Sequence, residues 1–290
     1  MFLRLCTAVA VFVALSLPAI ADDKLKNQAA EAMKKSDVQD ATIVETAHLV
    51  VASSLIETKA KALADSLEKT FNQAAKALKL DAGETKTQVT IFAFADLDNY
   101  KQFQRAVLRQ RPEDEQVASY DVKRDDPYIA VSARRGDKSP NFETLAGNEI
   151  CRALLARKSG NAKLTEWMKD GFAKSVYWRL NAGAAGADRA FVARIAPPVK
   201  KGAKGGMCPC DKAWTGTGKE KELVAASLME YFTVGAGAEK FGNVVAGLIP
   251  TDAAATPTFM DALKAAEWMI DDLDKSWREW LGKGSPATAK

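Results

Sequence analysis

The sequence contains very few residues that bind metals through nitrogen or sulfur. Among its 290 residues there is one histidine, His48, and there are four cysteines, of which Cys6 belongs to the first apolar stretch. A hydrolytic zinc ion of the two-histidine, one-carboxylate kind needs two imidazoles besides the acid and a water molecule. One imidazole cannot fill two positions, so the composition excludes such a centre. We expect His48 to have a structural role.

Long apolar runs are equally scarce. The one clear example follows Arg4 and ends at Ala19-Ile20-Ala21, before an acidic pair. A basic residue, a short apolar core and a small-residue end are typical of a secretory signal peptide. We therefore expect residues 1–21 to be cleaved after Ala21, the rest of the chain to lack a membrane span, and the protein to be secreted or periplasmic.

Charge of one sign does not dominate either. Lysine and arginine number 41, aspartate and glutamate number 37, and the two signs are interleaved along the chain. Proteins that bind nucleic acids concentrate positive charge on one face or helix, so this pattern excludes a nucleic-acid partner. The densest basic run, at residues 200–204, lies among glycines and is typical of a solvated loop.

The first half of the chain mixes strand and helix patterns, in which apolar positions recur in β-rich runs or at helical spacing. A charged lead-in at residues 22–41, either a loose segment or a frayed helix, precedes them. The patterns predict a strand at 42–53, a helix at 57–78, a strand at 89–94, a helix at 98–108, an antiparallel strand pair at 117–122 and 128–133, and helices at 142–157 and 164–180.

The second half is predicted to be helical. Residues 181–218 are rich in Gly, Ala and Lys and favour a loop. Helices are expected at 219–234, 238–248 and 258–281, inside a subdomain of residues 219–282 that a tail of residues 283–290 follows. The pattern indicates an α+β fold, with a small mixed β-sheet and flanking helices over residues 42–180 and then an all-helical subdomain.

Two short segments resemble a known motif. Residues 148–152 read NEICR, and residues 167–173 read WMKDGFA. With the order of elements around them, they are similar to the gluzincin (thermolysin-like) zinc metallopeptidases, in particular to the peptidase MA-like domains of exported bacterial proteins. In that family the two histidines of an HExxH helix and an acid on the next helix bind zinc, and the glutamate acts as general base.

The resemblance places four residues of this chain at the family's site. Asn148 and Arg152 stand where the zinc-binding histidines would be, Glu149 where the general base would be, and Asp170 where the acidic ligand would be. An amide oxygen is a weak ligand and a guanidinium has no acceptor atom, so we expect no zinc, no other cofactor and no hydrolysis. Arg152 is expected either to pair with Asp170, Glu149 or both, or to extend into solvent.

The remaining cysteines leave several pairings open. Cys151 lies in the first segment, and Cys208 and Cys210 lie in the predicted loop. An odd number of thiols in an oxidising compartment leaves at least one unpaired within the chain. The alternatives are a disulfide from Cys151 to Cys208 or Cys210, a bond between Cys208 and Cys210, and free thiols.

The resemblance also implies a cleft. In the family the edge strand beside the metal helix lines the substrate cleft and pairs with extended peptide. Tyr128, Ile129 and Val131 on the predicted strand, together with Cys151 and Trp167, are expected to line such a cleft here. A strand covered by a loop or by its own neighbour is the alternative, and it would leave no place for a peptide.

Two function classes follow from these patterns. The first is an exported binding or scaffolding module without catalysis, whose partner is an extended peptide, a protein of the cell envelope or a cell-wall polymer. The second is an active hydrolase with an atypical site built from Glu149, Asp170 and Cys151. Stoichiometric zinc in the purified protein would favour the second class.

Overall fold

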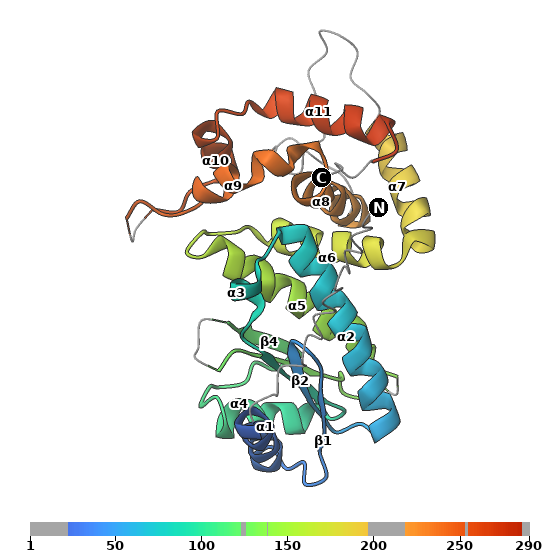
Figure 1. Cartoon of the computed structure of the whole chain (residues 1–290), viewed down its shortest axis with the longest axis vertical. Coiled ribbons are helices and arrows are strands. Elements are labelled where there is room, and N and C mark those ends of the chain that lie inside the picture. The colour runs from blue at the N-terminus through green and yellow to red at the C-terminus, as the bar shows by residue number, and fades with distance from the viewer. Residues whose placement is uncertain (1–22, 123–125, 138, 197–217, 253–254, 286–290) are drawn as a thin grey trace, which may run out of the picture.

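Five short strands form one mixed β-sheet, and helices cover both of its faces (Figure 1). The computed structural model describes residues 23–122, 126–137, 139–196, 218–252 and 255–285. The strand order is β1-β2-β3-β5-β4. The strands are β1 (Thr42–Glu45), β2 (Leu49–Ser53), β3 (Val89–Phe94), β4 (Ala118–Asp121) and β5 (Tyr128–Ser132). The predicted α+β fold class is confirmed.

The three central strands run parallel, and the two outer strands are antiparallel to their neighbours. Parallel strands covered on both faces have continuous apolar sequences, and every residue of β2, β3 and β5 is buried. The predicted antiparallel pair of β4 and β5 is confirmed. The single strand predicted at 42–53 is wrong, because the chain turns at Thr46 and pairs β1 with β2 as a hairpin.

One face of the sheet packs on α1 (Asp23–Lys35) and α4 (Leu97–Ala106). For the charged lead-in at residues 22–41, a loose segment and a frayed helix were both open; the structure has a helix there, α1, so the loose segment is wrong. Ala29 and Met33 of α1 are buried in the same cluster as Phe92 of β3. This contact with the sheet stabilises a helix that has no strong apolar stripe of its own.

The opposite face carries the helices that build the candidate site. They are α2 (Glu57–Leu78), α5 (Phe142–Ser159) and α6 (Glu166–Leu180), and each matches a predicted helix within a few residues. A short helix, α3 (Ala82–Thr85), leads into β3. Ile91, Ile129 and Val131 of the sheet share one core with all three long helices.

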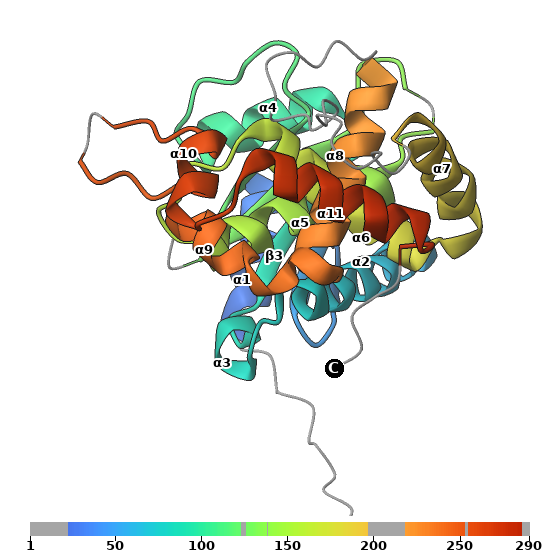
Figure 2. The same cartoon turned by 90° about the horizontal axis from the view of Figure 1, so that it is seen from above.

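The remaining helices form the other end of the molecule, with α8 between α6 and α11 (Figures 1 and 2). They are α7 (Ala182–Ile195), α8 (Gly218–Thr233), the 3-10 helix η1 (Ala236–Glu239), α9 (Phe241–Ala246), α10 (Phe259–Ala265) and α11 (Ile270–Gly282). Their core is continuous with that of the sheet and α5. None of the helices in the described ranges has the length and apolar character that crossing a membrane requires.

Two predictions for this end of the chain are wrong. The predicted loop begins with a helix, α7, whose Asp188 accepts a hydrogen bond from the Trp178 indole at 3.0 Å. The predicted helix at 258–281 is two helices, because Glu267 adopts a left-handed conformation with a φ of 50°. The rest of the predicted loop, residues 197–217, lies outside the described residues.

A buried carboxylate connects three of these helices. Glu230 of α8 is 1% exposed, and its Oε1 lies 2.6 Å from Arg179 Nε of α6. Arg189 of α7 donates from Nη2 to Oε1 and from Nε to Oε2, at 2.5 and 3.1 Å. Two guanidiniums thus compensate one buried charge, which is the condition for burying it without a large loss of stability.

Candidate functional site

Helices α5 and α6 position the residues of the motif. Asn141 caps α5, because its side chain accepts a hydrogen bond from the Thr144 amide at 3.0 Å. Four-residue spacing puts Asn148 and Arg152 on the same side of α5. Asp170 lies one turn into α6, which packs against α5.

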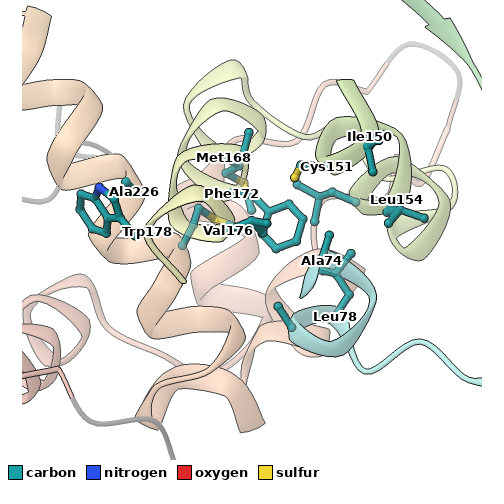
Figure 3. Packing of buried hydrophobic residues seen from close by; sticks show 14 of the residues in the cluster. Ala74, Leu78, Ile150, Cys151, Leu154, Met168, Phe172, Val176, Trp178 and Ala226 are labelled. Carbon is teal, nitrogen blue, oxygen red and sulfur yellow. The ribbon is translucent and has the colours of Figure 1, made fainter. Parts of the chain in front are cut away.

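The Asp170-Gly171-Phe172-Ala173 segment has a clear packing role. A Cβ atom at Gly171 would lie 2.5 Å from the carbonyl oxygen of Ala225, so only glycine lets α6 approach α8 this closely. Phe172 is fully buried between α5 and α6 (Figure 3). The segment therefore fixes the position of α6, and with it the carboxylate of Asp170.

Arg152 pairs with Asp170, which is one of the two alternatives predicted for this residue. Its Nη2 donates a hydrogen bond to Oδ1 of Asp170. Two more carboxylates lie close, since Nε is 4.0 Å from Glu149 Oε1 and Nη1 is 3.9 Å from Glu166 Oε2. Burial opposes the charge on Arg152, but the three acids outweigh burial and raise the pKa of the guanidinium. The alternative, extension of Arg152 into solvent, is wrong.

Glu149 is the least exposed acid of this cluster, with 12% of its side chain accessible. Burial raises the pKa of its carboxyl above the ordinary value, and Asp170 and Glu166 raise it further, against the opposite effect of Arg152. Tyr120 of β4 lies on the same side of the sheet, and burial raises the pKa of its phenol as well. Tyr120 was not among the predicted site residues, although its alternation with polar neighbours on β4 indicates the helix-covered face.

The residues at this position do not fit a catalytic zinc ion. Arg152 has no acceptor atom, and its guanidinium is bonded to the carboxylate that would have to bind the metal. In the described part of the chain, no three His, Cys, Asp or Glu side chains are grouped so that they could hold a metal ion. The donor set thus disagrees with zinc binding, and we derive no chemistry through a metal.

His48 lies in the β1–β2 turn and has the expected structural role. Its Nδ1 is 2.6 Å from Glu68 Oε1, and its ring stacks on Phe71 at a centroid distance of 4.5 Å. Thr46 donates to the other oxygen of Glu68 at 2.6 Å. Although burial opposes ionisation, these hydrogen bonds prevail and lower the pKa of Glu68.

Cys151 is unsuited to act as a nucleophile. It is 1% exposed, lies in the core beside Ile150 and Phe172 (Figure 3), and burial raises the pKa of its thiol strongly. A thiol needs a lowered pKa and access to react. Cys151 is a free thiol in the structure, which disagrees with a disulfide from Cys151 to the loop. Cys208 and Cys210 lie outside the described residues, so a bond between these two stays a prediction.

Of the two alternatives for the strand with Tyr128, Ile129 and Val131, the peptide cleft is wrong and the strand covered by its neighbour is confirmed. These residues are at most 6% exposed, and β5 is an interior strand paired with both β3 and β4. The strand that takes the edge position beside α5 is β4. Trp167 does not line a cleft there either, because its ring packs edge-on against Phe259 at 5.1 Å.

A groove opens on the other side of the ion pair, between α2, α5, α6 and α8. Its volume is about 960 Å³, and its lining includes Asn148, Asp170 and Cys151, the last of which was predicted to line a cleft, besides side chains that were not among the predicted site residues. Asn148 is half-buried, and its side chain forms no hydrogen bond with the residues that the structure describes. The motif therefore has two sides, a charged cluster around Arg152 and a polar groove beyond Asp170.

Comparisons with known proteins identify no family for this chain. No family model matches the sequence, and no curated protein matches it either. The resemblance to the peptidase MA-like domains remains a prediction from residues 148–152 and 167–173.

Proposed function

We propose that the protein is an exported, non-hydrolytic relative of the gluzincin metallopeptidases that acts as a binding or scaffolding module in the cell envelope. The observation that carries the proposal is the ion pair of Arg152 with Asp170, because it joins two positions that would both have to bind zinc. The signal-like first 21 residues support export. The burial of Cys151 and the cationic Arg152 both disfavour the alternative of an active hydrolase.

Zinc binding by the mature protein and by a restored variant tests this reading. We expect the natural sequence to contain no stoichiometric zinc and the double variant Asn148→His with Arg152→His to bind about one zinc ion per molecule. The reason is that Asp170 would then be released from its partner and would lie near two imidazoles with the spacing of the family motif. Elemental analysis after dialysis against zinc measures both.

The matched control is the same double variant with Asp170→Asn added, which should lose the zinc. A double variant that folds but binds no metal would show that residues 148, 152 and 170 do not form a former zinc site. Stoichiometric zinc in the natural protein, with peptide hydrolysis that a chelator abolishes, would instead establish the hydrolase alternative.

The partner we propose is an extended peptide or an envelope protein, and β4 is the element that supports this choice. It is an outer strand of the sheet, and its Tyr120 lies next to the charged cluster. Outer strands accept an additional strand through backbone hydrogen bonds. Slower hydrogen exchange at the amides of residues 118–120 upon addition of an envelope extract fraction or a peptide library would support docking there, and slowed exchange confined to other strands would contradict it.

A further inference from the structure

The groove beyond Asp170 has walls made mainly of helices, with the cap residues Asn141 of α5 and Asn181 of α6 at its margin. Lys69 comes from α2, Thr144 and Asn148 from α5, Lys174 and Tyr177 from α6, and Glu222 from α8. The backbone groups inside a helix bond to one another, so the groove offers a ligand backbone donors and acceptors only near the start of α5 and the end of α6. An extended peptide, which would need them, is recognised poorly here. A ligand of this groove must bond to side chains.

Charge in the groove is balanced. Lys174 lies 3.4 Å from Glu222, Asp170 is bonded to Arg152, and Glu143 accepts a hydrogen bond from Ser66. Lys69 adds one positive charge and Glu143 one negative charge, so together with Arg152 the groove has no net charge that would attract a strongly charged ligand. The groove therefore favours a neutral ligand that both donates and accepts hydrogen bonds, to which Asn148 offers an amide with both functions.

The floor and the rim of the groove differ in character. Small residues form part of the floor, namely Gly147, Cys151 and Ala173, and all of them are buried. At the rim, Tyr177 is 41% exposed, and Lys174 Nζ lies 5.5 Å from the centroid of its ring. The groove thus combines a small apolar floor, polar walls and an accessible aromatic ring.

A sugar ring has the complementary chemistry. Its hydroxyl groups donate and accept hydrogen bonds, and its C–H face is apolar and packs on an aromatic ring. An N-acetyl group adds an amide, which matches the Asn148 side chain, and a methyl group, which suits a floor of small residues. The volume of about 960 Å³ is at the upper end of the range of about 300–1,000 Å³ for small-molecule sites.

We propose that this groove binds a short neutral oligosaccharide that carries N-acetylated amino sugars, with Asn148 on the acetamido group and Tyr177 on a sugar face. This goes beyond the proposed function, because sugar binding depends neither on the absent zinc nor on a peptide at β4. The two proposals can therefore fail separately.

Titration of the mature protein with the β-1,4-linked trisaccharide of N-acetylglucosamine tests the proposal, by calorimetry and by amide chemical shifts. We expect the trisaccharide to bind and to shift amide signals of the groove residues. Maltotriose, which lacks the acetamido groups, should bind at least about tenfold more weakly. Asn148→Ala and Tyr177→Ala should each raise the Kd about tenfold. Neither side chain is buried, so both variants should fold, which the melting temperature checks.

The control is Asn27→Ala on α1, an exposed asparagine on the opposite face of the sheet, which should leave the Kd unchanged. No binding of the trisaccharide at millimolar concentration would overturn the proposal. Equal or tighter binding of maltotriose would overturn it as well. So would an unchanged Kd in both groove variants, or shifts that cluster away from α5 and α6.

Discussion

Replacing Arg152 by methionine isolates what its charge contributes. The methionine keeps much of the apolar stem and removes the guanidinium that three carboxylates surround within 4.0 Å. Asp170 and Glu166 are more than half exposed and will be hydrated after the change. Glu149, with 12% of its side chain exposed, will be a nearly buried anion without a cation in contact.

The loss of stability expected from Arg152→Met at neutral pH depends on how deeply the ion pairs are buried. Removing one partner of a fully buried ion pair costs about 3–5 kcal/mol, and an exposed pair contributes about 0–1 kcal/mol. The Arg152 side chain is 26% exposed, between these limits, so we expect Arg152→Met to lower the free energy of unfolding by about 2 kcal/mol at pH 7.

The loss should depend on pH, because burial already raises the pKa of Glu149 in the folded protein above its ordinary value of 4.5. A folded state that holds a proton more tightly than the unfolded state is favoured at low pH, and it loses this advantage as pH rises through the folded-state pKa. Removing Arg152 takes away an interaction that lowers this pKa, so the pKa rises further. The destabilisation should therefore be small near pH 4 and reach its full size at pH 7.

Urea unfolding of the natural protein and the variant at pH 4 and pH 7 measures this difference. Adding Glu149→Gln should restore much of the lost stability at pH 7, since it removes the uncompensated charge. The control is Arg135→Met, which breaks an ion pair with Asp98 whose side chains are 75% and 71% exposed, and which should cost less than about 1 kcal/mol at either pH. An equal cost of Arg152→Met at both pH values, or no rescue by Glu149→Gln, would refute the role given to Arg152.

Two further stability predictions concern the packing of α8 and are checked by the same denaturation experiment. Gly171→Ala should lower the free energy of unfolding by about 2 kcal/mol, because the new Cβ would lie 2.5 Å from the Ala225 carbonyl oxygen. The control is Gly186→Ala in α7, where a Cβ has no neighbour within 4 Å. It should raise the free energy of unfolding by up to about 1 kcal/mol. Glu230→Gln should cost about 3 kcal/mol or more, since it leaves two guanidiniums without their buried partner. Its control, Glu222→Gln, disrupts a half-exposed ion pair and should lower the free energy of unfolding by less than about 1 kcal/mol. If a variant and its control lose equal stability, the packing of α8 described above is contradicted.

The central elements of the fold and the ion pair could be predicted from the sequence. Helices α2, α5 and α6 and strand β3 have regular apolar patterns with local causes. The pairing of Arg152 with Asp170 was among the predicted outcomes because the motif fixed both positions on adjacent helices. These features depend on short-range periodicity and on one known arrangement of two helices.

The turn between β1 and β2 could not be predicted in the same way. It contains neither glycine nor proline, the usual signals of a turn. The side chain of Glu68 stabilises it by bonding Thr46 and His48 from 20 residues or more along the chain. Helix α7 is a similar case, because the contacts of Asp188 and Arg189 with α6 and α8 hold a segment whose composition favours a loop.

The error about the edge strand was avoidable. Tyr128–Ser132 is a continuous apolar run, which is typical of an interior strand, whereas Ala118–Asp121 alternates between apolar and polar residues. The resemblance gave the position of an edge strand beside α5 but not which strand of the antiparallel pair occupies it. The composition of the two strands predicts that β4 is the edge strand.

The arrangement around Arg152 explains why a change at one motif position requires a change at another. Asp170 and Glu166 disfavour the charge on Glu149 and raise its pKa, so the three acids need a cation among them. A guanidinium supplies that charge without a metal, and it leaves no coordination position for a water molecule. The side chain that stabilises the three acids is thus also the one that is incompatible with a metal ion at this position. Replacing Arg152 alone by histidine should therefore leave the site short of a second imidazole, whereas the change at both Asn148 and Arg152 supplies the ligands and the space together.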